Sequence, residues 1–251
     1  MRTENLHVDA PQSLRLCVSI AVIWMIVGLM VDVASAQNPE LQQRIEDVKK
    51  AAAQNKQELA QYTWVEQVNI NLKGEQKKQE HFQVRLGPDG KPQKTSLDPA
   101  DSAESGGHHG RLREHVVEKK KEEYKEYADQ IRALVQQYVP PDQSLLQQAA
   151  QLGNIMMGPE GTPGQVRLVI TNYIKPGDKV TLVIDKEQKK LSSAAIDSYL
   201  NDPKDAVNVS VQFASIPDGP NHVATETING VSKQLTINVQ NSNYQRLPSG
   251  D

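Results

Sequence analysis

Three histidines stand close together near the middle of the chain, in the stretch GGHHGRLREH. His108 and His109 are adjacent in a Gly-rich segment, and His115 follows with Glu114 beside it. Imidazole and carboxylate groups are common zinc ligands, so one hypothesis is a metal site with His108 and His109 as candidate ligands. Structural zinc sites place paired ligands on ordered elements, and the sequence shows no matching second set. We therefore favour a solvated loop, and we expect neither a metal nor another cofactor.

The sequence contains no pattern typical of catalysis. It has no Ser-His-Asp arrangement and no pair of carboxylates suited to acid–base work. The segment GPEGTPG (158–164) lacks the Lys-Ser/Thr that completes a phosphate-binding loop. The isolated His222 follows the turn residues DGPN, and we expect it at the surface. We therefore predict that the protein is not an enzyme.

One carboxylate interrupts an otherwise apolar pattern. In YTWVEQVNINL (62–72) every second residue is apolar, except that Glu66 occupies one of these positions. A carboxylate on a buried face needs a partner or takes up a proton, because an isolated charge is costly to bury. Two interpretations stay open. Glu66 lies inside the apolar face, where it pairs with a cation or contacts an amine of a ligand, or it lies in water near the end of the strand.

A predicted export signal precedes the helices and strands that position these residues. An apolar run from Leu16 to Val31 precedes the small-x-small motif Ala34-Ser35-Ala36. This pattern predicts a signal peptide over residues 1–36, cleaved after Ala36, and a protein that works in the periplasm or is secreted. The rival interpretation is an uncleaved anchor, but the run is short for a span of ~20 residues. We expect no stable membrane span in the mature chain.

Composition restricts both the core and the partners. The chain has 251 residues, of which 37% are hydrophobic and only 4% aromatic, so the core must consist mainly of Val, Ile and Leu. The net charge is −3, which argues against nucleic acid as a partner because such proteins carry a clear basic excess. The charged stretch EKKKEEYKEY balances its lysines with glutamates and is typical of a solvated helix face.

Strict alternation of apolar and polar residues marks the strands. In VNVSVQF, Val207, Val209, Val211 and Phe213 share one side, while Asn, Ser and Gln share the other. Successive side chains of a strand point to opposite faces, so this pattern predicts a sheet with one buried face. The same pattern places further residues on the apolar face: Trp64, Val68, Ile70, Phe82 and Val84.

Two helices are predicted at residues 113–157, after a polar loop at 98–112 that we expect to be mobile. Tyr124, Ile131 and Tyr138 recur every seven residues, with Val135 between them, and form an apolar stripe on the first helix. The second helix is expected over QSLLQQAAQLGNIMM, with Met156 on its buried side. A further helix begins near Asn38, where Asn-Pro is a good N-terminus.

The predicted fold is a single α+β domain over residues 37–251. It consists of a curved antiparallel sheet, a half-barrel of about nine or more strands, with an N-terminal helix and an inserted helical pair covering one face. Even strand spacing and short turns favour consecutive antiparallel neighbours.

Four stretches carry a resemblance to a known group: YTWVEQVNINLKGEQKK, GPDGKPQKT, NYIKPGDKVTLVIDKEQKKL, and SIPDGPNHVATET with LTINVQNSNYQRL. Over nearly all of residues 38–247 the chain resembles the outer-membrane lipoprotein carrier superfamily, in particular a lipoprotein-sorting-like branch of exported bacterial proteins. In the carriers an incomplete barrel presents a concave apolar face to acyl chains, and helices act as a lid. No functional residue of the carriers aligns one by one with this sequence.

The resemblance implies a non-enzymatic carrier of acyl chains, lipoproteins or another hydrophobic ligand. Its partner would be that ligand or a lipidated protein, and we expect a monomer. The alternative is an envelope interaction or scaffold protein whose sheet face is filled by its own helices. The candidate ligand-binding residues are Trp64, Val68, Ile70, Phe82, Val84, Val209, Val211, Phe213, Tyr124, Ile131 and Val135.

Overall fold

The computed structural model describes residues 50, 53–99, 111–139 and 142–248. The predicted signal peptide at 1–36 lies outside these residues. Most of the predicted loop at 98–112 also lies outside them, and with it His108 and His109. Cleavage of the signal peptide, mobility of the loop and the absence of a metal site there therefore stay predictions.

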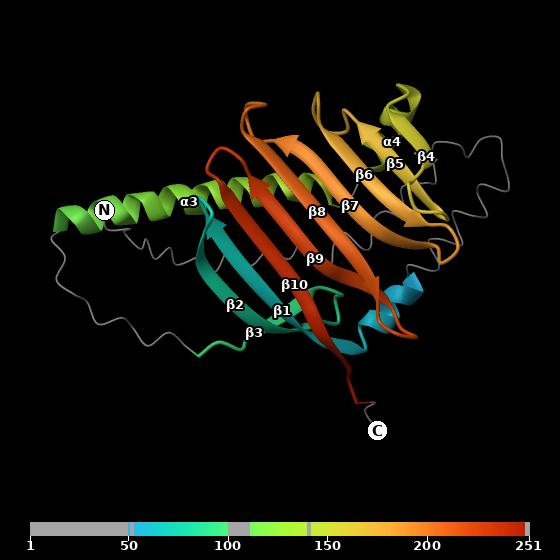
Figure 1. The fold of residues 1–251 in the computed structure, drawn as a ribbon, viewed down its shortest axis with the longest axis horizontal. Coiled ribbons are helices and arrows are strands. Elements are labelled where there is room, and N and C mark those ends of the chain that lie inside the picture. The colour runs from blue at the N-terminus through green and yellow to red at the C-terminus, as the bar shows by residue number, and fades with distance from the viewer. Residues whose placement is uncertain (1–49, 51–52, 100–110, 140–141, 249–251) are drawn as a thin grey trace.

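Ten antiparallel strands form one curved, open sheet (Figure 1), which confirms the predicted α+β fold class. The strands are β1 (Tyr62–Leu72), β2 (Glu75–Leu86), β3 (Pro92–Ser96), β4 (Ile155–Pro159), β5 (Gln165–Thr171), β6 (Lys179–Asp185), β7 (Lys190–Tyr199), β8 (Ala206–Ser215), β9 (Asn221–Gly230) and β10 (Leu235–Arg246). Their order is β3-β2-β1-β10-β9-β8-β7-β6-β5-β4. Every neighbouring pair except β1–β10 is consecutive among the strands, so the last strand of the chain joins the first hairpin to the rest of the sheet.

Tight turns connect the long hairpins. Between β1 and β2, Lys73 and Gly74 both have positive φ values, 54° and 81°. Two successive left-handed residues match the right-handed twist of a two-residue hairpin, and glycine adopts this conformation without steric cost. The turn and the register shift between Ile70 and Asn71 together fix which residues of β1 and β2 share a face.

Two labelled helices lie in the middle of the chain, α3 (Arg111–Tyr138) and α4 (Gln143–Gln151). The side chain of Asp142 caps α4, accepting hydrogen bonds from the backbone N–H groups of Ser144 and Leu145 at 2.8 and 3.3 Å. Figure 1 shows α3 as a long helix lying across one face of the sheet. Residues 53–59, just before β1, are also helical.

The prediction that the second helix continues through Met156 is wrong. Helix α4 ends at Gln151, and Gly153 adopts a positive φ of 72°, while the N–H of Asn154 bonds back to the carbonyl of Ala149 at 2.8 Å. This left-handed residue stops the helix. Met156 then lies in the edge strand β4 with 57% of its surface exposed, rather than on a buried helix side.

The core lies between one face of the sheet and the helices. Strand β1 alternates in burial from Trp64 to Leu72, and β8 alternates from Val207 to Val211, as the sequence pattern predicts. The other face of the sheet carries polar side chains. Folding therefore places the buried apolar residues of these strands on the side that α3 covers.

Candidate functional site

Two rows of side chains cross the buried face of the sheet, and we call them the central rows. The first consists of Ile70, Ile237, Ile228, Val209, Ile196, Val180 and Ile170. The second consists of Val68, Val239, Glu226, Val211, Ala194, Leu182 and Leu168. Every member except Val180 is buried. Each row spans seven strands, or ~29 Å at the usual strand spacing.

Helix α3 packs beside the first central row. Gly230 ends β9 opposite both Leu235 and Val207, and a Cβ added there would lie 2.6 Å from Tyr127 Cε1 and 2.7 Å from Ile131 Cδ1. The helix can approach the sheet this closely because glycine has no side chain. The predicted stripe of α3 is thus confirmed as its packing face: Ile131 and Val135 are buried, and Tyr124 is partly buried against the core.

The end of α3 is fixed by a buried polar contact. The hydroxyl of Tyr138 donates to Asp178 Oδ2 at 2.7 Å and lies 2.8 Å from the hydroxyl oxygen of Ser198. Burial raises the pKa of Tyr138, so the hydroxyl keeps its proton. Earlier in the helix, Tyr127 donates to Asp205 at 2.8 Å and accepts from Ser232 at 3.2 Å. Two tyrosines therefore attach α3 to loops at the ends of the strands.

The helical residues 53–59 contact the opposite end of β9. The side chain of Asn55 donates to the carbonyl of Asn221 at 3.0 Å and accepts from its N–H at 2.6 Å. Along β9, Ile228 and Glu226 of the central rows lie between this contact and the contact of α3 at Gly230. The two helical elements therefore touch β9 on either side of the central rows.

A charged pair borders the second central row. Glu66 lies two residues from Val68 on β1, and its carboxylate accepts a hydrogen bond from Lys94 of β3. The side chains are 3% and 7% exposed, so this is a buried ion pair. Burial raises the pKa of Glu66, although Lys94 acts in the opposite direction. Of the two interpretations of Glu66, the structure supports the buried, paired one.

Aromatic and amide groups extend the polar end of this face. The Trp64 and Tyr244 rings stack at a centroid distance of 5.5 Å, and His222 lies 4.0 Å from Tyr244. The indole N–H of Trp64 donates to Asn241 Oδ1 at 3.2 Å, and Asn241 donates to the carbonyl of Val223 at 3.0 Å. The Trp64 indole and the Asn241 amide therefore both have partners within the sheet.

The expectation that His222 lies at the surface is wrong. The residue is 7% exposed, because β9 begins at Asn221 and so includes it in the sheet, where the Tyr244 ring packs against it. Burial lowers the pKa of its imidazole, which favours the neutral ring. Turn residues before a histidine do not decide its burial, since the following strand determines which way it points.

Glu226 is a buried carboxylate that sequence reasoning did not identify. It lies in the second central row with 1% of its surface exposed, opposite Val239 and Val211. The available signal was parity, because Glu226 and the apolar Ile228 are two residues apart on one strand and so share a face. Glu66 and Glu226 are separated by one strand, β10, on an otherwise mainly apolar face.

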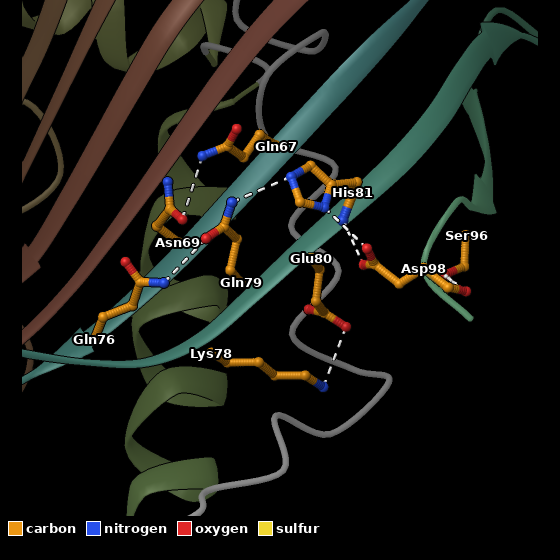
Figure 2. A network of polar contacts seen from close by, with 9 residues as sticks. All are labelled: Gln67, Asn69, Gln76, Lys78, Gln79, Glu80, His81, Ser96 and Asp98. Carbon is orange, nitrogen blue, oxygen red and sulfur yellow. Dashed lines mark hydrogen bonds and ion pairs between the residues drawn. The ribbon is translucent and has the colours of Figure 1, made fainter. Parts of the chain in front are cut away.

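The opposite face of β1 and β2 is a solvated network of amides and charges (Figure 2). Gln67 donates to Asn69 at 3.4 Å on β1, and His81 contacts the carboxylate of Asp98 at 2.9 Å through its ring and 2.7 Å through its N–H. Burial acts to raise the pKa of Asp98, but the two hydrogen bonds from His81 and the nearby positive charges together lower it. On the other side of β2, which faces the core, Lys78 and Glu80 form an ion pair at 3.2 Å, and both side chains are 25% exposed (Figure 2).

Most of the predicted ligand-binding residues lie on one continuous face. Trp64, Val68, Ile70, Phe82, Val84, Val209 and Val211 are buried on the sheet, whereas Phe213 is only partly buried. The register of β8 against β9 shifts between Gln212 and Phe213, which breaks the alternation there. The structure brings these residues together, and their contact with a ligand stays a prediction.

Within the described ranges, no group of three or more His, Cys, Asp or Glu residues could hold a metal ion. None of the helices among the described residues is long and apolar enough to cross a membrane.

Comparison with known proteins gives similarities of structure only. No protein-family model matches the chain, and no curated protein sequence matches it. A crystal structure of a DUF1329 family protein from Desulfovibrio piger has a TM-score of 0.40 and 14% identity, covering 82% of this chain and 94% of that one. A LolA superfamily protein from Nitrosomonas europaea has a TM-score of 0.37 and 9% identity, with the same coverage of 82% and 94%. At these identities neither structure assigns a ligand or an activity to this chain.

Proposed function

We propose that the protein is a non-enzymatic carrier or binding protein for a hydrophobic ligand, such as an acyl chain or a lipidated protein, in the periplasm or outside the cell. The central rows carry this proposal. Thirteen of their fourteen side chains are apolar, and they form one strip across seven strands. An acyl chain needs only apolar contacts, because it has no hydrogen-bonding groups to satisfy.

Binding must involve movement of whatever covers these rows. Val209, Val211 and Ile228 are 1–3% exposed, so a ligand gains contact only where another group withdraws. The part of α3 around Tyr127 is better suited to such movement than its end, because Tyr127 holds it to Asp205 and Ser232 through hydroxyl hydrogen bonds, whereas Tyr138 fixes the end in a buried contact. The bond from Ser232 contributes about 0.5–1.5 kcal/mol and the bond to the charged Asp205 about 1.5–3 kcal/mol, and both can exchange with water.

The near-complete burial of the same residues favours a second candidate. In that case the face is filled permanently by the chain's own helices, and the protein is an interaction or scaffold protein of the cell envelope. Such a protein would co-purify with one stoichiometric protein partner and without lipid. The carrier would instead take up a free lipid or the acyl chain of a lipidated protein.

Titration of delipidated protein with a fluorescent fatty acid tests the carrier directly. Saturable binding with one or a few sites is expected, and native mass spectrometry should show the added mass. If neither method detects binding, the carrier proposal fails.

Two adjacent alanines of β7 provide a matched pair of variants. Ala194 is buried in the second central row, whereas Ala195 is partly exposed on the opposite face. Ala194→Leu should fill space along the row and weaken fatty-acid binding about tenfold, while Ala195→Leu should leave it within about twofold. Circular dichroism at the assay temperature confirms that both variants are folded. Equal affinities for the two folded variants would place the ligand elsewhere.

A further inference from the structure

The buried pair of Glu66 and Lys94 lies where a ligand on the central rows would end. Glu66 is opposite Asn241 of β10 and Phe82 of β2, one step beyond Val68 of the second central row. Lys94 is opposite Val84, and its Nζ lies 5.9 Å from the centroid of the Phe82 ring. A polar pair thus borders one end of the apolar strip.

Folding stability alone gives little reason for this pair. Removing two charges from water costs several kcal/mol per ion, and well-packed apolar residues are often at least as stabilising as a buried ion pair. The surrounding face consists largely of Val, Ile and Leu, which would pack there without that cost. A charged pair retained at such a place suggests recognition of a charged group.

The two members of the pair differ in how easily they can change partner. Glu66 lies on β1, which is paired on both sides, so its carboxylate is held within the sheet. Lys94 lies on the five-residue edge strand β3, and its four-carbon stem can redirect the ammonium group. Burial also favours the protonated form of Glu66, which weakens the ionic attraction between the two side chains.

We propose that Lys94 binds the anionic head group of the ligand, a carboxylate or a phosphate, in place of Glu66, while the apolar chain of the ligand lies along the central rows. This inference rests on the proposed carrier function and specifies the class of its ligand. Glu66 serves as the internal counter-ion of Lys94 while no ligand is bound.

Four probes with the same twelve-carbon chain test this assignment: dodecanoate, dodecyl phosphate, dodecanol and dodecylamine. Each displaces a neutral fluorescent lipid from the purified protein at one pH and ionic strength. The anionic probes should bind about tenfold more tightly than dodecanol, because a charge-assisted hydrogen bond is added. Dodecylamine should bind least tightly, and the tighter of the two anions identifies the head group.

Variants of the two partners should have opposite effects. Lys94→Met should remove the preference for anions while leaving dodecanol affinity within about twofold. Glu66→Gln removes the competing carboxylate and should strengthen dodecanoate binding about threefold to tenfold. Lys78→Met is the matched control, because Lys78 of β2 lies on the same face of the sheet as Glu66 and Lys94. Its partner is Glu80 and not Glu66. This variant should leave the preference unchanged.

The combined variant Glu66→Gln with Lys94→Met guards against misfolding, since it leaves no unpaired charge from this pair. It should bind dodecanol like the unsubstituted protein and show no preference for anions. Equal affinity of the unsubstituted protein for dodecanol and dodecanoate, or an unchanged preference in Lys94→Met, would overturn the inference and leave the carrier intact. Failure of all four probes to bind would overturn both.

Discussion

The phenolic oxygen of Tyr138, at the end of α3, lies 2.7 Å from Oδ2 of Asp178, which stands just before β6. The same carboxylate accepts three backbone hydrogen bonds, from the N–H groups of Tyr173, Ile174 and Lys175 at 2.6, 2.9 and 3.0 Å. Asp178 is 1% exposed. One buried carboxylate thus closes the β5–β6 turn and fixes the end of the helix that covers the sheet.

Tyr138→Phe should reduce the free energy of unfolding by about 1–3 kcal/mol, because it removes a buried hydrogen bond to a charged group. Urea unfolding followed by circular dichroism measures this change. Tyr199→Phe is the control, since the Tyr199 hydroxyl donates to the Pro176 carbonyl in an exposed contact. That variant should lose about 0.5 kcal/mol or less. Equal losses in the two variants would show that the contact with Asp178 has no special role.

Gly230→Ala should destabilise the packing of α3 on the sheet. Its new Cβ would lie within 2.8 Å of three side-chain atoms of Tyr127 and Ile131, so these side chains or the whole helix must shift. We expect a loss of about 1–3 kcal/mol and faster amide hydrogen exchange in α3. Gly158→Ala, where nothing lies within 4 Å of the added Cβ, should change neither quantity appreciably. Unchanged exchange in Gly230→Ala would contradict the close approach of helix and strand.

The stability of the protein should depend on the protonation of His222. Burial lowers the pKa of His222 in the folded state below its ordinary value of 6.5. Between that lowered pKa and 6.5 the unfolded chain binds more protons than the folded one, so stability falls as pH decreases through this window. The stability that the neutral ring contributes is fully present above pH 6.5.

His222→Gln removes this titration and should flatten the dependence. The measurement is the free energy of unfolding at a series of pH values from 7.5 to about 5, where histidine titrates. The unsubstituted protein should lose more stability over this range than the variant. Identical slopes would show that His222 titrates in the folded protein as it does in the unfolded chain.

The two faces of β8 should differ in how well they tolerate threonine, because Val209→Thr adds a hydroxyl to the buried face, whereas Ser210→Thr keeps the hydroxyl of the exposed face and adds only a methyl group. Val209→Thr keeps the shape of the side chain but places a hydroxyl on the buried face, which should cost about 1–3 kcal/mol. Ser210→Thr, one residue further and exposed, should change stability by less than about 0.5 kcal/mol. Thermal and urea unfolding of both variants provide the comparison. A small loss in Val209→Thr would mean that water reaches this part of the central rows.

Local pattern predicted a large part of this molecule. Val207, Val209 and Val211 alternate with polar residues, and the structure buries all three. The stripe with Ile131 and Val135 on α3 also packs as its spacing indicates. These features follow from the two-residue period of strands and the 3.6-residue period of helices, which depend only on neighbours in sequence.

Other features were missed for two different reasons. Met156 continues an apolar helical pattern, but the nearby Gly153 ends the helix, a stop signal present in the sequence, and pairing with β5 makes Met156 part of an edge strand. His222 follows a turn, yet Tyr244, from another strand, covers it. No rule based on neighbours in sequence includes the strand or ring that arrives from elsewhere in the chain.

The sequence by itself determined the apolar and polar faces of most strands, the existence of α3 and α4 and the positions of most turns. Only the tertiary structure decided that β10 joins β1 to the rest of the sheet, that Glu66 meets Lys94 in a buried pair, and that Glu226 lies among the central rows. The physical reason is that the alternation of apolar and polar residues indicates only which side of its own strand a residue occupies. Its partners across the sheet depend on strand order and register, which form only when the whole chain packs.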